Sequence, residues 1–165
     1  MTDDTVEMLA ALHVFRDYPV FGVGPGQFPR FYFVDYSKSA DIKFRDIVVP
    51  RRAHNLYLEL AAEVGAVGLA VFLAIVGLLM RALGAARRAV AAHDEEAADL
   101  AGAMWLGLLA YLVSGLLLHI AYQRYFWLLL AMASSALHIV RSRHPEIAWG
   151  TALRVRPASA REAVR

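Results

Sequence analysis

The sequence predicts an all-α integral membrane protein with three transmembrane helices and an N-terminal head of helix and loop. Its 165 residues are 59% hydrophobic and 19% charged, with a mean hydropathy of +0.45, whereas soluble domains are about 45–50% apolar and about 25% charged. Three stretches contain no Asp, Glu, Lys or Arg: 64–80, 100–123 and 125–140. This pattern excludes an ordinary soluble core and an intrinsically disordered chain, and the absence of cysteine excludes a disulfide-stapled mini-protein.

The distribution of charged residues and histidines indicates whether nucleic acid or a metal ion is an expected partner. The chain carries 17 Lys and Arg against 15 Asp and Glu, and the cations are scattered rather than gathered on one basic face, so no nucleic-acid partner is expected. The histidines lack the spacing of metal ligands, so the sequence predicts no metal ion and no other cofactor.

Residues 1–54 are expected to form the head. Residues 1–17 predict an amphipathic helix that Thr2 or Asp3 caps. The stretch YPVFGVGPGQFPRFY has three Gly and three Pro in 15 residues, which predicts a loop. No strand precedes GVGPG and no Lys-Ser/Thr pair follows it, so a nucleotide-binding loop is excluded. A short strand or turn is expected over 41–49.

The membrane region is expected over 55–140, because a span needs about 20 apolar residues. The predicted spans are about 60–80, 100–118 and 125–140, with a polar connection over 81–99 that is expected as a loop, with a helix as the alternative. Residues 100–140 as one helix would be about 61 Å long, twice the hydrocarbon core, so a hairpin turn is expected near 119–124.

Residues 141–165 predict a disordered, Arg-rich tail that meets anionic membrane lipids. Three spans put the two termini on opposite faces of the membrane. The loop at 81–99 and the tail together carry slightly more Lys and Arg than the head and the hairpin turn. The positive-inside rule therefore favours a head outside the cytoplasm and a tail within it.

The most informative stretch is RRAHN at 51–55, followed after nine residues by a Gly-x-x-Gly at 65–68. Since His54 and Gly65 are 11 residues apart, about three turns, a continuous helix would align His54, Gly65 and Gly68 in one stripe. The two glycines would then let a neighbouring helix pack closely. Arg51 and Arg52, together with free N–H groups at the helix start, would suit a phosphate or diphosphate.

Three further residues have two readings each. Asn55 is equally a helix cap and a substrate contact, and Arg30, just after the Gly-rich loop, is a candidate substrate contact. Glu63 is expected inside the first span, where an ionisable group is by default functional. However, it lies about half a turn around the helix from His54 and about 13 Å lower, so a bond to a neighbouring helix is favoured over a catalytic role.

Three segments, PVFGVGPGQF, RAHNLYLELAAEVGAVGL and RYFWLLLAMA, resemble the C-terminal part of the O-antigen ligase and polysaccharide polymerase family of bacterial membrane proteins. The ligase pattern is His, then Asn, Ser or Gln, nine residues, and Gly-x-x-Gly followed by Val, Thr or Tyr. His54, Asn55, Gly65 and Gly68 match it and Leu69 departs from it. The resemblance covers about residues 12–140.

This resemblance implies a metal-independent, GT-C-like glycosyltransferase of the bacterial inner membrane. Such enzymes move a glycan from undecaprenyl diphosphate to a hydroxyl of lipid A core, of a growing glycan or of a protein. It implies that His54 is the general base, and that Arg51 or Arg52 stabilises the leaving diphosphate. Members of the family have many more spans, so the chain is interpreted as a C-terminal fragment that is inactive alone. The alternatives are a repeat-unit polymerase of the same family, and a non-catalytic small membrane subunit or transporter-like protein.

Overall fold

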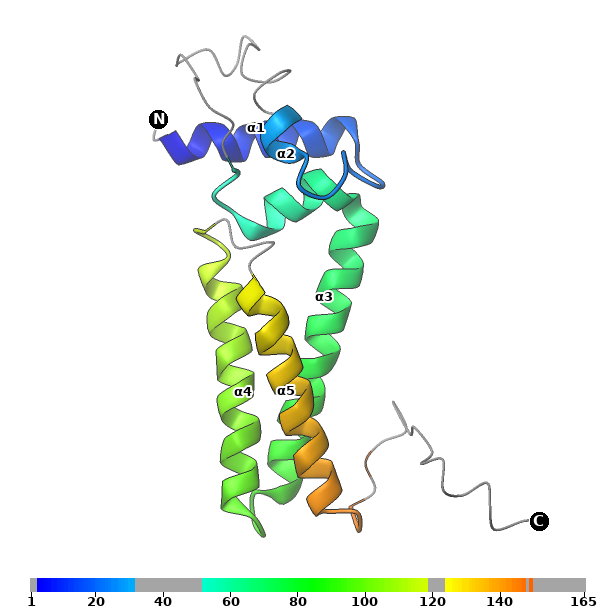
Figure 1. The fold of residues 1–165 in the computed structure, drawn as a ribbon, viewed down its shortest axis with the longest axis vertical. Coiled ribbons are helices and arrows are strands. Elements are labelled where there is room, and N and C mark those ends of the chain that lie inside the picture. Colours follow the sequence, from blue (N-terminus) through cyan, green and yellow to red (C-terminus); the bar gives the residue numbers. More distant parts are fainter. Residues whose placement is uncertain (1–2, 32–51, 119–123, 148, 150–165) are drawn as a thin grey trace, which may run out of the picture.

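In the computed structural model, three long helices stand side by side and a helical head lies across one end of them (Figure 1). The structure describes residues 3–31, 52–118, 124–147 and 149. Within these ranges every regular element is a helix, which confirms the all-α prediction. The helices are α1 (Asp3–Asp17), α2 (Phe28–Phe31), α3 (Leu56–Val90), α4 (Glu95–Ser114) and α5 (Arg124–Arg143).

Helix α3 is bent at Gly65, which has φ 67° and ψ −172°. Its first part, residues 56–64, lies across the end of the bundle beside α1, and its second part, residues 66–90, runs down the bundle (Figure 1). We call these the transverse segment and the descending segment. The descending segment has 25 residues and is therefore about 37 Å long, enough to cross a hydrocarbon core of about 30 Å.

A glycine-rich loop, residues 18–27, satisfies the backbone groups that the bend leaves without helical partners. The amides of Val23 and Gly24 donate to the carbonyls of Ala62 (3.0 Å) and Glu63 (2.8 Å). On the other side of the bend, the amides of Ala66 and Val67 donate to the carbonyls of Pro19 (2.8 Å) and Val20 (3.3 Å). Because a buried unpaired backbone group is costly, the loop and the bend stabilise each other.

The head has its own apolar cluster. Three residues of α1, namely Ala10, Ala11 and Val14, are fully buried together with Phe28 of α2 and Ala62 of the transverse segment. The small side chains allow α1 to lie close against α3. Each of α1, α2 and α3 contacts the other two. The head is thereby a packed unit that fixes the start of α3.

The bundle of α3, α4 and α5 is held by a second, alanine-rich cluster. Small residues let helix backbones approach closely in a membrane, where packing replaces the hydrophobic effect. The fully or mostly buried members are Leu83, Ala86, Val90, Ala97, Ala98, Ala101, Leu108, Ala133, Leu137 and Val140.

The outward faces of the three long helices are apolar and exposed, as in Leu78 (65% exposed) on α3 and Leu106 (60%) on α4. By length and composition all three could cross a membrane. In the apolar window of α3 only 11% of the residues are buried, so nearly all of that surface is available to lipid or to further helices. This agrees with the three predicted spans.

The helix bounds differ from the predicted spans, 60–80, 100–118 and 125–140, mainly at their polar ends. In the polar connection 81–99 the helical alternative holds for most residues, because the chain is helical up to Val90 and again from Glu95. Its Ala, Arg, Leu and Glu residues have high helix propensity, and the turn needs only residues 91–94, where Asp94 caps α4 by accepting from the Ala97 amide (2.9 Å).

The last helix likewise runs past the predicted boundary at 140 to Arg143, and Ile147 and Trp149 pack back against the bundle cluster. The ordered structure therefore extends into the stretch predicted as a tail. The rest of that stretch, 150–165, lies outside the described residues, as do the turn residues 119–123 and the strand or turn expected at 41–49.

Candidate functional site

His54 stands immediately before the cap of α3 and has the left-handed backbone conformation, with φ 49°. Such a conformation is uncommon for a residue with a side chain and costs about 1–3 kcal/mol, so the surrounding structure must enforce it. The imidazole is half-buried, between the fully buried Ala53 and the nearly buried Asn55. Strained, half-buried residues of this kind concentrate at functional sites.

Asn55 holds the backbone beside His54, because both the oxygen and the nitrogen of its side-chain amide form hydrogen bonds. Its Oδ1 accepts from the amides of Tyr57 (3.0 Å) and Leu58 (2.9 Å), which makes it the N-cap of α3. Its Nδ2 donates to the carbonyl of Leu116 (3.0 Å), just after the end of α4. This geometry supports the helix cap as the role of Asn55. The same hydrogen bonds hold Asn55 in place and thereby fix the backbone next to His54.

The start of α3 is docked onto the end of α4. The Leu56 amide donates to the Gly115 carbonyl (2.7 Å), and the Tyr57 hydroxyl donates to the Leu112 carbonyl (2.8 Å). A Cβ at Gly115 would lie 2.6 Å from Leu56 Cδ2, so the close approach requires glycine there. The pairing joins the positive end of one helix dipole to the negative end of another.

This docking corrects one expectation from the sequence. The first amides of α3 are occupied by Gly115 and Asn55, and the Glu59 amide donates to the Asn55 carbonyl (3.0 Å). Free N–H groups at this helix start were expected to help hold a phosphate. Since they are already bonded, an anion here would depend on side chains.

Arg52 supplies such a side chain, and Glu59 holds it. The Arg52 Nη1 lies 3.0 Å from Glu59 Oε1, while the Glu59 side chain is fully buried and the Arg52 side chain is 37% exposed. A buried carboxylate is stabilised by a cation or by hydrogen bonds that it accepts, and the contact between Arg52 and Glu59 fixes the guanidinium. Its remaining donors stay accessible to a ligand. Arg51, the other predicted guanidinium, lies outside the described residues.

Glu63 is placed differently from the expectation. It lies one residue before the end of the transverse segment, so it lies beside the head rather than within the span, and its partners are backbone amides of the loop and of the first residue of α2. Its Oε2 accepts from the Gly26 amide (2.8 Å) and its Oε1 accepts from the Phe28 amide (3.0 Å). The side chain is fully buried, so its carboxylate fastens the glycine-rich loop and the start of α2 to α3.

The two glycines of the Gly-x-x-Gly pattern also differ from the expected helix seam. A Cβ at Gly65 would lie 2.2 Å from the Val20 carbonyl oxygen, so Gly65 packs against the loop backbone rather than a neighbouring helix. At Gly68 a Cβ would meet the side chain of Val64 in the same helix, at 2.4 Å. The bend interrupts the single stripe expected to start at His54.

Arg30 is exposed on α2. The element carrying it is anchored next to the site, because Phe28 is buried in the head cluster and its amide is bound by Glu63. Arg30 and Arg52 therefore belong to one packed head. Among the described residues no three His, Asp or Glu side chains gather in a way that could hold a metal ion.

Sequence reasoning missed two features of this site. The pairing of Glu59 with Arg52 is not signalled by helical spacing, because Arg52 precedes the start of α3 and the two residues are seven positions apart. The docking of α3 on Gly115 had no local signal, because it joins residues about 60 positions apart.

Comparison with known proteins places this geometry in context. Residues 6–73 match the family model described as O-antigen ligase, and this segment contains most of α1, together with α2, the glycine-rich loop, the transverse segment and the first turns of the descending segment. A comparison with curated proteins finds no match. The family match confirms the resemblance on which the motif around His54 was interpreted.

Proposed function

We propose that this chain, whose residues 6–73 match the O-antigen ligase family model, carries the acceptor-activating site of a membrane glycosyltransferase. The reaction moves a glycan from undecaprenyl diphosphate to an acceptor hydroxyl of a glycan or lipid A core. The observation that carries the proposal is the half-buried His54, held in a left-handed conformation beside the anchored Arg52.

His54 is the general base of this reaction. An imidazole titrates near neutral pH and can take a proton from a positioned hydroxyl, which contributes about 10²–10⁴-fold to the rate. The acceptor oxygen gives its proton to His54 and forms a bond to the anomeric carbon. The bond from that carbon to the diphosphate oxygen breaks, its electron pair leaves with the lipid diphosphate, and the configuration inverts.

Arg52 stabilises the charge that grows on the leaving diphosphate. A guanidinium binds phosphate oxygens with two parallel hydrogen bonds, and a cation fixed before the reaction stabilises the transition state without reorganising. Glu59 provides that fixation through its 3.0 Å contact. Arg51, Arg30 and the Glu63-held loop are proposed to complete the donor site.

The proposed orientation follows from the charges on the connecting segments. The head, with His54 and Arg52, lies on the extracytoplasmic side of the bacterial inner membrane, where lipid-linked glycans are transferred, and the C-terminus lies in the cytoplasm. The three apolar helices support placement in a membrane, and their exposed faces leave room for further helices of a larger enzyme.

The experiment is a His54→Ala substitution in the gene in its own host. We expect surface glycan attachment or chain growth to fall at least about 100-fold, because the general base is lost, while the amount of membrane-inserted protein stays unchanged. The matched control is His93→Ala, which removes an exposed histidine from the turn at the other end of the bundle. Wild-type glycan levels in the His54 variant would refute the base assignment.

The accumulating product distinguishes the two reactions of the family. If the enzyme is a ligase, the His54 variant should accumulate lipid-linked polymer that is not attached to its acceptor. If it is a repeat-unit polymerase, only single repeats should be found. Gel electrophoresis of the extracted glycolipids separates these outcomes.

A further inference from the structure

A groove runs between the descending segment of α3 and the first half of α4, at the end of the bundle opposite the head. Two adjoining cavities of about 330 Å³ and about 470 Å³ form it, and Gly84, Arg88 and Trp105 line both. Arg87 and Gly102 line the first cavity and Arg81 the second. The site proposed above lies at the other end of α3, so this groove has no part in that chemistry.

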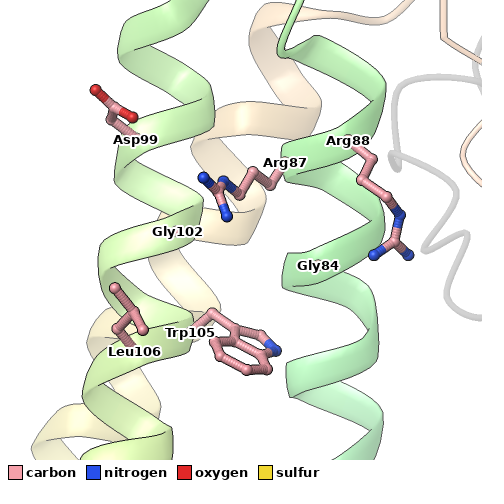
Figure 2. Close-up of a pocket in the computed structure, with 7 residues that line it drawn as sticks. All are labelled: Gly84, Arg87, Arg88, Asp99, Gly102, Trp105 and Leu106. Carbon is pink, nitrogen blue, oxygen red and sulfur yellow. The ribbon is translucent and has the colours of Figure 1, made fainter.

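The groove is surrounded by guanidinium groups without acidic partners. In the described part of the chain, Arg81, Arg87 and Arg88 form no ion pair. Asp99 also lines the first cavity, but its carboxylate points away from Arg87 (Figure 2). The groove is therefore suited to an anion.

At the same end of the bundle, the cations in and just after the last turn of α5 do have partners. Arg143 is paired with Glu96 (3.6 Å), and His144 is paired with Asp94 (3.1 Å). Arg141 lies over the ring of Trp149, at 5.9 Å. The cations that end α5 thus have partners within the protein, whereas those around the groove do not.

Two donors converge above Gly84. A Cβ built there would lie 3.5 Å from Arg88 Nη1 and 3.9 Å from Trp105 Nε1, and no acceptor for that indole N–H is present among the described residues. Across the groove, Arg87 reaches toward Gly102, where a Cβ would lie 3.2 Å from Arg87 Nε (Figure 2). The two glycines keep open a space that N–H donors face from both helices.

The groove lies at the depth of the lipid headgroups. The charge-free run of α3 ends at Met80, one residue before Arg81, and Trp105 is six residues after Asp99, or about 9 Å along α4. Tryptophan is enriched at this interface, and basic residues there attract anionic lipids. The neighbouring Leu106 is 60% exposed and offers an apolar surface to an acyl chain.

We propose that this groove binds the phosphate of an anionic phospholipid, in the membrane leaflet opposite the head. Arg87 and Arg88 supply the positive charge and Trp105 donates a hydrogen bond. Because three guanidinium groups surround the space without paired carboxylates, a headgroup with net negative charge binds better than a zwitterionic one.

Trp105 provides the measurement, since the sequence contains only two other tryptophans. The full chain carrying Trp127→Phe and Trp149→Phe is reconstituted in phosphatidylcholine vesicles that contain either brominated phosphatidylglycerol or brominated phosphatidylcholine. We expect the anionic lipid to quench Trp105 fluorescence at lower mole fraction. Arg87→Gln with Arg88→Gln should weaken this preference about tenfold or more.

Two variants make the test specific. Arg143→Gln removes the same charge as Arg88→Gln at the same end of the bundle, and should leave the preference unchanged. Gly84→Leu fills the groove without changing any charge, and should abolish the preference while circular dichroism shows an unchanged helix content. If Arg143→Gln has the same effect as Arg88→Gln, or if Gly84→Leu retains the preference, the attraction is to the surface in general and the proposed site is wrong.

Inorganic phosphate distinguishes the two sources of the anion. If the groove binds lipid, millimolar phosphate should not displace brominated phosphatidylglycerol, because free phosphate lacks the acyl chains. Displacement by phosphate would overturn the assignment to a phospholipid.

Discussion

Two neighbouring carboxylates on the transverse segment, Glu59 and Glu63, are both fully buried but have different partners. Glu59 pairs with a guanidinium, whereas Glu63 accepts two backbone amides, from Gly26 and Phe28. The first holds a residue proposed to contact the donor. The second holds the loop that stabilises the bend in α3.

Glu63→Gln should therefore destabilise the head although it preserves the shape of the side chain. The amide NH2 of glutamine would face one of the two backbone N–H donors, which loses a hydrogen bond and leaves a buried donor unpaired. We expect a loss of about 1–3 kcal/mol in the free energy of unfolding, measured by denaturant titration in micelles. The control Glu95→Gln, exposed on α4, should change stability by about 0.5 kcal/mol or less; equal losses in both variants would contradict the role of Glu63.

At the scale of elements, the bend in α3 depends on Gly65. Its φ and ψ fall in a region that only glycine occupies readily, and the atoms that a Cβ would meet belong to the Val20 backbone. Gly65→Ala should release the glycine-rich loop, with a loss of more than about 4 kcal/mol. Faster chymotrypsin cleavage after Phe21 would report the release.

Gly77→Ala is the matched control for this substitution. A Cβ at Gly77 meets no atom within 4 Å, and alanine is the better helix former by about 1 kcal/mol. We expect unchanged cleavage after Phe21. If Gly65→Ala behaves like Gly77→Ala, the bend does not depend on the glycine.

The same element shows what the sequence could and could not predict. Hydrophobic runs and the cap residue Asn55 are local signals, so three helices and the start of α3 were predictable. The bend was not, because Gly65 within an apolar run also fits a continuous helix and the groups that stabilise the bend lie about 40 residues earlier. The local motif likewise identifies His54 and Arg52 as candidate site residues. Because the bend has no local signal, the sequence places Glu63 within the span.

At the scale of the whole molecule, the two ends of the bundle are closed in different ways. The head closes one end with a packed core. At the other end His144 links α5 to the cap of α4 through Asp94 (3.1 Å), and it also contacts Glu146 (3.0 Å). The hydrogen bond that His144 donates to Asp94 raises the pKa of His144 above 6.5, while the amide of Ala97 and then His144 lower the pKa of Asp94 below 3.8.

The sign of the pH dependence follows from these two directions. A raised histidine pKa stabilises the fold fully below pH 6.5, and this contribution is lost as the pH rises through the pKa of the folded state. The lowered pKa of Asp94 contributes above 3.8 and is lost in stronger acid. Thermal unfolding should therefore show a fall in stability as the pH rises from 6.5 through the pKa of His144 in the folded state, and His144→Gln should flatten this fall. His93→Gln should not change the fall in stability with pH. If the fall persists in the His144 variant, the interpretation is wrong.

The hydrogen bonds across the bend at Gly65 imply that the shape of α3 is conditional on a distant part of the chain. A peptide of residues 52–90 alone would lack the Pro19, Val20, Val23 and Gly24 backbone groups, so full backbone hydrogen bonding in a membrane would require α3 to form an uninterrupted helical rod. Such a rod would carry the imidazole into line with the lipid chains instead of folding it over the bilayer surface. The angle that the native chain maintains therefore depends on the glycine-rich loop, which precedes α3 in the sequence, and only the assembled protein holds His54 at the place proposed for the acceptor.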